Sequence, residues 1–335
     1  MTERRRRPTL RDIAEETGLS SAAVSYALRG LHVPAETQAR VREAAERLGY
    51  QADPIARALA SGRTGFVGVL CGSLTDPWQQ SVAAGLGRGL LGAGRNAITL
   101  DADNEPDREA ELAARLADQR VDALVVLPVD PLAAHWKDLA ERVPLVSVGD
   151  GLPRARTAGE VVYDNATGLR HGLRTLHEAG HTLVTVLTPS DRATPDRPAE
   201  TIVRQVATSL GMTTRLRTAP HDLDGATAVA RAELTGPEAP TAFLCLADAI
   251  AHGVYAAAGE LGLTVPADVS VIGYDDLPVS RLLNPPLSTY RWSVDELVAD
   301  VVRYVVAAIE DGGNGERTVL QPSPMPRASV AAPRT

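Results

Sequence analysis

Apolar residues recur at helical spacing over the first fifty residues of the chain. Residues 10–30 contain two such runs, which are separated by Gly18. Ser20 and Ser21 stand at the start of the second run and are candidate N-caps. Glycine suits a sharp turn there because it tolerates a positive φ. Residues 36–48 keep the same period and predict a third helix. The pattern predicts a helix-turn-helix, whose second helix can enter a DNA major groove, with an ordinary helical hairpin as the alternative.

Beyond residue 66 short apolar runs alternate with helical periods. A first series predicts strands at 66–70, 97–100, 123–127 and 145–148, and helices at 77–92, 108–119 and 132–141. A second series predicts strands at 183–187, 215–218, 242–246 and 269–273, and helices at 166–179, 199–210, 225–234 and 247–261. A helix at 294–309, a Gly-rich turn at 311–315 and a Pro-rich end complete the chain. Such alternation indicates parallel sheets covered on both faces, so we expect an α/β core of two doubly wound subdomains with a cleft between them.

Charge is distributed unevenly between the two parts. The net charge is −8, yet residues 1–63 carry 11 Arg and 8 acidic residues, whereas the remainder carries 23 basic and 34 acidic residues. A small basic head on an acidic body is expected where only the head contacts phosphate. The run at residues 4–7 consists of four arginines, which either contact the DNA backbone or form a solvated tail.

The remaining composition points to a cytoplasmic protein. Cys71 and Cys245 lie in apolar runs and have no nearby ligand partner, so we expect buried thiols rather than a disulfide or a metal site. The N-terminus lacks the apolar segment of a secretory signal, and no run of 18 apolar residues predicts a membrane span. We therefore expect neither a membrane nor a cofactor as a partner.

An ordered set of segments carries a resemblance that covers the chain from Thr9 to about Ser329. They are TLRDIAEETGLSSAAVSYAL, PAETQARVREAAERLGYQADPIARAL, SGRTGFVGVL, TDPW, PDREAELAARLADQRVDALVVLP, YDNATGLRHGLRTLHEAGH, LTVPADVSVIGYDD and NPPLSTYRWSVDELVAD. In these segments the sequence resembles the LacI family of bacterial transcription regulators. The resemblance implies a head at residues 1–63 with a hinge helix at about 53–60, and an effector-binding and dimerisation domain at 64–330. That domain would divide into an N-subdomain at about 64–163 and 292–322 and a C-subdomain at about 164–291.

For the head, the resemblance implies a homodimer that reads a pseudo-palindromic operator in double-stranded DNA. The DNA-contact positions that it assigns are Thr9, Ser20, Ser21, Ala22, Ala23, Ser25, Tyr26, Arg29, Arg57 and Leu59. Serine hydroxyls can reach phosphates or base edges, Ala23 can meet a thymine methyl, and Arg29 can pair with phosphate or guanine. Many members have Arg where this chain has Tyr26, so the operator is expected to depart from the common family sequence. Leu59 corresponds to a leucine that wedges into the central base step from the minor groove, although it could instead cap the core domain.

For the body, the resemblance implies a fold like that of periplasmic sugar-binding proteins, with a small ligand between the lobes. The ligand positions that it assigns are Asp76, Trp78, Arg197, Ala247, Asp248 and Asp275. Carboxylates and an Arg facing an aromatic plane suit a polyhydroxylated ligand, and the resemblance implies a carbohydrate. Each residue alone could be a loop residue or a helix cap; Asp248 could be a helix N-terminal acid and Asp276 a structural turn residue. The chain departs from the family at Ala247, where Asn is common, and at residues 200–202, where Gly-Phe-Arg is common.

Three other classes of protein agree less well with the sequence. An enzyme is disfavoured because the glycines of residues 85–94 lack the strand-then-helix context and the Lys-Ser/Thr of a phosphate loop, no GxSxG occurs, and the histidines lack metal spacing. A small-molecule-binding protein, such as a free sugar-binding protein, would need a signal peptide and no helix-turn-helix, and the sequence shows the reverse. A DNA-binding regulator without effector control is favoured only by the altered cleft. We therefore predict a dimeric, sequence-specific repressor that is controlled allosterically by a small ligand.

Overall fold

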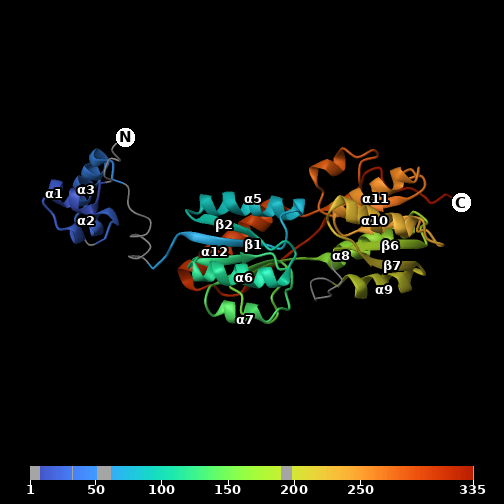
Figure 1. Cartoon of the computed structure of the whole chain (residues 1–335), viewed down its shortest axis with the longest axis horizontal. Coiled ribbons are helices and arrows are strands. Elements are labelled where there is room, and N and C mark those ends of the chain that lie inside the picture. The colour runs from blue at the N-terminus through green and yellow to red at the C-terminus, as the bar shows by residue number, and fades with distance from the viewer. Residues whose placement is uncertain (1–7, 32, 51–61, 190–197, 335) are drawn as a thin grey trace. The chain divides into compact units, whose positions relative to one another are not determined.

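The protein folds into two compact units, residues 1–64 and 65–335, which we call the head and the body. The computed structural model describes residues 8–31, 33–50, 62–189 and 198–334. In the head it contains α1 (Leu10–Thr17), α2 (Ser21–Leu28) and α3 (Ala35–Leu48) (Figure 1). All three helices agree with the sequence pattern, and α3 begins one residue earlier than expected.

Local chemistry explains the turns of the head. Gly18 follows α1 with a φ of 68°, in the left-handed region that favours glycine. The Ser20 hydroxyl oxygen then accepts a hydrogen bond from the Ala23 backbone N–H at 3.2 Å and caps α2. The three helices bury a small apolar core of Ile13, Ala14, Val24, Ala27, Val41, Ala44 and Ala45. The α1–turn–α2 unit is therefore the predicted helix-turn-helix, closed by α3.

The first lobe of the body is a parallel sheet of six strands in the order β11-β5-β4-β3-β1-β2. Its strands are β1 (Phe66–Cys71), β2 (Asn96–Asp101), β3 (Ala123–Val126), β4 (Leu145–Gly149), β5 (Gly159–Tyr163) and β11 (Glu316–Leu320). Helices α5 (Pro77–Gly92) and α12 (Val294–Asp311) pack together over one face, and α6 (Pro106–Asp118) and α7 (His135–Ala140) pack over the other. Side chains of β1 alternate between these two layers, since Val67 and Val69 join the core under α5 while Leu70 joins the core under α6.

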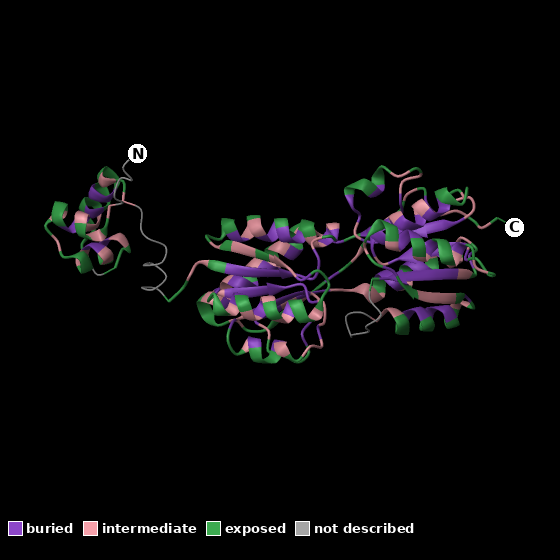
Figure 2. Ribbon diagram, viewed as in Figure 1, coloured by how far each residue is buried: buried purple, intermediate pink, exposed green. Residues whose placement is uncertain are grey.

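The second lobe is a parallel sheet of four strands in the order β7-β6-β8-β9. Its strands are β6 (Leu183–Thr188), β7 (Thr213–Thr218), β8 (Ala242–Cys245) and β9 (Ser270–Ile272). Helices α8 (Asn165–Glu178) and α9 (Ala199–Leu210) cover one face, and α10 (Leu223–Leu234) and α11 (Asp248–Glu260) cover the other. Figure 2 shows that the central strands of both lobes are buried while the outer surfaces of the helices are exposed. The expected fold class, a helical head and a core of two doubly wound parallel sheets, is confirmed.

Several short elements were not expected from the sequence. β5 and β11 add two strands to the first lobe, and β10 (Thr289–Arg291) pairs antiparallel with β12 (Ser323–Met325). A 3-10 turn, η1 (Pro278–Arg281), follows the loop after β9. The segment read as a Pro-rich end therefore contains β11 and β12, because residues 316–320 find a parallel partner in β5, more than 150 residues earlier in the chain. No helix in the described part of the chain is long and apolar enough to cross a membrane.

Candidate functional site

Helix α2 presents one exposed face in the head. Val24 and Ala27 point into the head core, whereas Ser21, Tyr26 and Arg29 are exposed. Ala22 is also exposed, and Ala23 and Ser25 are partly exposed. The predicted contact residues of this helix thus lie on the side away from the head core, which is the arrangement that a recognition helix needs.

Tyr26 and Arg29 form the most prominent part of that face. The Tyr26 side chain is 44% exposed, and the Arg29 guanidinium lies 5.2 Å from the centroid of its ring. The Arg29 Nε also donates a hydrogen bond to the Ser25 backbone carbonyl at 3.3 Å. The pair therefore presents a phenol and a cation together, a combination that can contact both bases and phosphates.

Two other predicted DNA-contact residues act within the head itself. The backbone N–H and the hydroxyl of Thr9 both donate hydrogen bonds to the Asp12 carboxylate, at 2.6 and 2.7 Å, and Ser20 caps α2. These bonds fix the starts of α1 and α2. Ser20 accepts in its bond and can still donate its hydroxyl hydrogen to a phosphate, whereas Thr9 would have to release Asp12 to do so. Arg57 and Leu59 lie outside the described residues.

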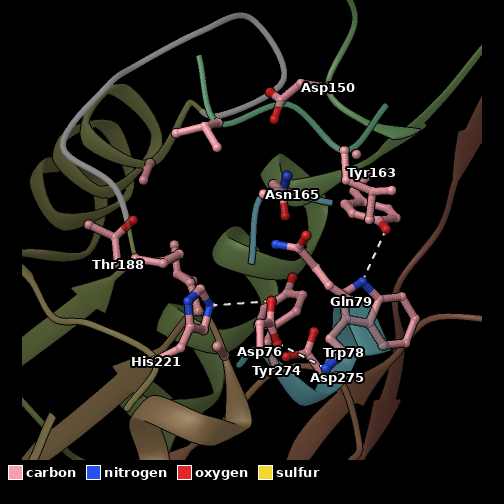
Figure 3. Close-up of a pocket in the computed structure, with 18 of the residues that line it drawn as sticks. Asp76, Trp78, Gln79, Asp150, Tyr163, Asn165, Thr188, His221, Tyr274 and Asp275 are labelled. Atoms are coloured by element: carbon pink, nitrogen blue, oxygen red, sulfur yellow. Dashed lines mark hydrogen bonds and ion pairs between the residues drawn. The ribbon is translucent and has the colours of Figure 1, made fainter. Parts of the chain in front are cut away.

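The body contains a cavity of about 620 Å³ whose walls come from both lobes. The first lobe contributes loops that follow β1 and β4, including Asp76 and Asp150. The second lobe contributes Thr188 at the end of β6, and His221 and Asp275 in the loops that follow β7 and β9. These residues lie at or beyond the carboxyl ends of parallel strands, where ligands of open α/β sheets bind. Figure 3 shows their side chains converging from different elements.

Aromatic rings form one wall of this cavity. Tyr163 stacks on Trp292 with centroids 4.7 Å apart, and Trp78 meets Tyr163 edge-on at 6.2 Å. The Trp78 indole N–H donates a hydrogen bond to the Tyr163 hydroxyl at 3.1 Å, and Tyr274 continues the cluster 5.6 Å from Trp292. Burial raises the pKa of the Tyr163 hydroxyl far above its usual range, so this group remains protonated. The wall offers flat apolar faces with a hydroxyl at its edge.

Asp76 lies at the start of α5 and links the two lobes. Its Oδ1 accepts a hydrogen bond from the Trp78 backbone N–H at 2.9 Å, which caps α5. Its Oδ2 lies 3.8 Å from Nε2 of His221, a residue of the second lobe, and the contact becomes an ion pair when the imidazole is protonated. Figure 3 shows this contact across the cavity.

Asp275 reaches the same cavity from the loop after β9. Its φ of 106° lies in the left-handed region that non-glycine residues rarely adopt, and its backbone N–H is held by the Tyr290 carbonyl at 2.8 Å. Burial raises the pKa of its carboxyl well above the usual range, and the nearby carboxylates of Asp248 and Asp76 raise it further. A strained, partly desolvated acid in a cavity is typical of functional sites.

Asp248 does not line the cavity, in contrast to the sequence prediction. Its side chain is completely buried and accepts hydrogen bonds from the Leu277 backbone N–H at 2.8 Å and from the hydroxyls of Ser280 and Thr289, both at 2.6 Å. Burial raises its pKa to about 6 despite these three donors. The carboxylate therefore fixes the loop after β9, while its neighbour Ala247 lines the cavity. Arg197 lies outside the described residues.

Sequence reasoning missed several residues that the structure brings to the cavity. Tyr163, Tyr274 and Trp292 lie far apart in the chain, and His221 follows an edge strand. The scarcity of aromatic residues, 4% of the chain, was the available signal, since an unusual share of them gathers in this one cluster. Asp276, by contrast, is the predicted structural turn residue, because its buried carboxylate is bound by Arg281, Arg291 and Arg327.

Both cysteines of the chain are buried. Burial raises the pKa of the Cys71 thiol to about 12, with smaller contributions from Asp101 and Asp76, and the pKa of the buried Cys245 thiol is also raised. Within the described ranges, no group of three or more His, Cys, Asp or Glu residues could hold a metal ion.

Family models match the two units separately. The model of bacterial regulatory proteins of the lacI family matches residues 9–53, and that of the periplasmic binding protein-like domain matches residues 173–330. Curated relatives match nearly the whole chain. The HTH-type transcriptional regulator MalR of Streptomyces coelicolor is 31% identical over 96% of this chain and 96% of its own length. The ribose operon repressor of Haemophilus influenzae is 28% identical over 96% and 98%, respectively.

Solved structures share the fold. The Lac repressor dimer bound to operator and the anti-inducer ONPF matches with a TM-score of 0.85 at 23% identity, covering 98% of this chain and all of that chain. The transcriptional regulator CelR in complex with cellobiose matches with a TM-score of 0.71 at 23% identity, covering 96% of this chain and all of that chain.

Proposed function

The chain belongs to the LacI family of bacterial regulatory proteins, and from this membership we propose that it is a dimeric repressor whose affinity for operator DNA is set by a small molecule in the body cavity. The proposal of ligand control rests on the observation that residues of both lobes line the cavity. Asp76 belongs to one lobe and Asp275 to the other. A ligand that binds both favours the arrangement of the lobes in which both contacts are made, and it can shift the equilibrium by its differential affinity.

The proposed ligand is polyhydroxylated. Carboxylates at one end of the cavity accept hydrogen bonds from hydroxyl groups, and the rings of Trp78, Tyr163 and Trp292 offer apolar faces for the C–H side of a sugar ring. Relatives support this class, since one is named a ribose operon repressor and a similar structure holds cellobiose.

The proposed DNA reader is the exposed face of α2. We expect Ser21, Ser25, Tyr26 and Arg29 to face the major groove, with two heads of a dimer reading two half-sites. The described head residues carry six Arg and six acidic residues, and the segment 51–61 carries one Arg and one Asp, so the positive excess of residues 1–63 comes from residues 1–7. The salt dependence of binding is therefore expected to come largely from the four arginines of residues 1–7, with Arg57 as a further candidate phosphate contact.

Leu59 remains a predicted wedge at the centre of the operator. Its replacement by Ala should weaken operator binding while dimerisation and ligand binding persist, and unchanged operator affinity would remove the wedge from the proposal. The site of action is proposed to be the cytoplasm, where the bacterial chromosome is accessible.

A gel-shift experiment with DNA from upstream of the protein's own gene tests the proposal. At low salt the full-length protein should bind this DNA with a salt-dependent affinity, and one of a panel of candidate metabolites should change that affinity. Failure to bind at low salt, with and without metabolites, would refute DNA regulation at this site. Binding that no metabolite alters would favour a regulator without effector control.

Matched variants separate the two sites. Replacing Arg29 by Gln should weaken operator binding by about 1–3 kcal/mol, whereas Arg231→Gln, which removes an exposed body arginine paired with Glu260, should leave it unchanged. Replacing Asp275 by Ala should abolish the ligand response and preserve DNA binding. A retained response would place the ligand elsewhere.

A further inference from the structure

The described part of the cavity wall has a strongly one-sided charge. Its acidic members are Asp76, Asp150, Glu200 and Asp275, and it includes neither Lys nor Arg among the described residues. The undescribed segment 190–197 contains two Asp and two Arg, so it does not alter the formal balance. A ligand of this cavity therefore enters a negative field.

Asp76 and Asp275 are the two acids that contribute most to this negative charge at the ligand site. Glu200 is already bound to Arg204, on its own helix, and Asp150 makes other contacts, which leaves Asp76 and Asp275 as the acids that a ligand would meet. Figure 3 shows both at the same end of the cavity, beside Tyr274. They are near enough for Asp76 to raise the pKa of Asp275, while the titratable groups facing this pair are His221, Asp248 and the Tyr274 hydroxyl.

The hydrogen bonds within the protein leave this charge poorly compensated. Asp76 receives the Trp78 N–H and a distant imidazole, and Asp275 receives the backbone N–H of Asp248. Asp276 illustrates the contrast, since its carboxylate is bound by three guanidinium groups. A neutral hydroxyl can form a hydrogen bond with Asp275 in either protonation state, whereas a cation favours the ionised form of both acids and offsets the repulsion that raises the pKa of Asp275.

The aromatic wall favours the same class of ligand. Trp78, Tyr163, Trp292 and Tyr274 lie against the cavity, and the face of an indole or phenol ring attracts a cation as well as an apolar C–H surface. At position 247 the wall carries a methyl group, which supplies no hydrogen bond to a neutral sugar.

We propose that the ligand of this cavity is a polyhydroxylated molecule with a positively charged amino group, such as an amino sugar, which binds with that group between Asp76 and Asp275. This inference rests on the proposed ligand-controlled repressor and narrows its ligand class. The amino group supplies N–H donors to both carboxylates, and the hydroxyl groups face the remaining polar side chains of the wall, among them Gln79.

Calorimetric titration of the full-length protein with matched sugars tests this inference. The probes are glucose, galactose and mannose, each compared with its 2-amino counterpart and with the corresponding N-acetyl sugar, in which the nitrogen is neutral. At least one amino sugar should bind tenfold or more tightly than both of its neutral counterparts. Equal or weaker binding of the amino sugars, or no binding by any of them, would overturn the inference.

Isosteric variants test whether the carboxylates of Asp76 and Asp275 recognise the amino group. Asp275→Asn and Asp76→Asn should each reduce the amino-over-neutral preference at least fivefold, whereas Glu260→Gln, which neutralises an exposed acid on α11, should leave it unchanged. Preference that survives both cavity variants would also overturn the inference. Release of operator DNA by a neutral metabolite in the gel-shift experiment would leave the proposed function intact while the amine assignment fails, so the two can be told apart.

Discussion

Gly168 is the position where a single methyl group should perturb the cavity most directly. It lies in α8, and a Cβ added there would be 1.2 Å from the Tyr274 Oη and 2.4 Å from its Cζ. The Tyr274 ring is 2% exposed and stacks on Tyr290 with centroids 4.6 Å apart, so it has little room to move. Gly168→Ala must therefore displace a packed ring that directly precedes Asp275.

The magnitude follows from two opposing effects. Replacing Gly by Ala in a helix interior gains about 1 kcal/mol of helix propensity. Overpacking of a tight core costs about 1–3 kcal/mol, and a contact this short belongs at the upper end of that range. Gly87 on α5 is a matched control, because no atom lies within 4 Å of its added Cβ and only the gain applies. We expect Gly168→Ala to be roughly 2–3 kcal/mol less stable than Gly87→Ala.

Urea unfolding and thermal melting of the two variants measure this difference. It should appear as a melting temperature lower by about 4–12 °C, since 1 kcal/mol corresponds to about 2–4 °C in proteins of this size class. Tyr274→Phe alone should change stability little, because the Tyr274 hydroxyl has no hydrogen-bond partner among the described residues. The double variant Gly168→Ala/Tyr274→Phe should recover part of the loss. Equal stability of Gly168→Ala and Gly87→Ala would refute the packing argument.

Three further predictions concern other parts of the molecule. Ile13→Ala, which opens the fully buried head core, should cost about 2–5 kcal/mol and abolish DNA binding without lowering the melting temperature of the body, as gel shift and calorimetry can check. The pKa of Asp248 rises from 3.8 to about 6 on folding, so the folded state binds this proton at a higher pH than the unfolded state does. The free energy of unfolding of the parent protein, relative to that of Asp248→Asn, should therefore increase by about 1 kcal/mol as the pH falls from about 7.5 to about 5. A difference between the two proteins that stays constant with pH in urea unfolding would contradict this sign. Deleting residues 329–335 removes Ser329, whose hydroxyl donates to the Val271 carbonyl and accepts from the Ser288 N–H, so the body should lose several kcal/mol in urea unfolding, at about 1–3 kcal/mol for each buried group left unpaired.

The sequence was most informative where periodicity is strong and local. The helices at 77–92 and 199–210 were predicted with the bounds observed, because an apolar face and an end signal coincide in each. The strand β11 could not be recognised, since ERTVL is mostly exposed and its strand character depends on pairing with β5. Strand formation of this kind is decided by distant residues and not by local propensity.

The sequence predicted which loops supply the candidate site, but not which way each side chain points. Asp76, Trp78, Ala247 and Asp275 follow strands in the sequence and do line the cavity. Asp248 has the same residue type and an equivalent position, yet its carboxylate turns to the Leu277 N–H and to hydroxyls 32 and 41 residues away. Which way a side chain at a helix start points depends on donors that no local pattern reveals.

Asp275 and Asp276 are adjacent in the chain but have opposite electrostatic surroundings. Both have positive φ values, of 106° and 53°, and nothing in the adjacent sequence distinguishes them. Burial raises the pKa of Asp275, and no cation among the described residues counters it. Burial also acts on Asp276, but hydrogen bonds from Arg327, Arg291 and Arg281 outweigh it and hold its pKa below the usual range.

The ion pairs of Asp276 and the conformation of Asp275 are connected through the turn that both residues share. The Arg contacts of Asp276 tie the turn after β9 to β10 and to the segment that follows β12. A turn anchored in this way can hold its neighbour in a strained conformation, because the strain of Asp275 is offset by ion pairs that do not involve the ligand. Asp275 is thereby oriented toward the cavity before any ligand arrives, so little ordering entropy is lost when one binds. Arginines 15 and 51 residues beyond Asp276 thus prepare the carboxylate on which we expect ligand recognition to depend.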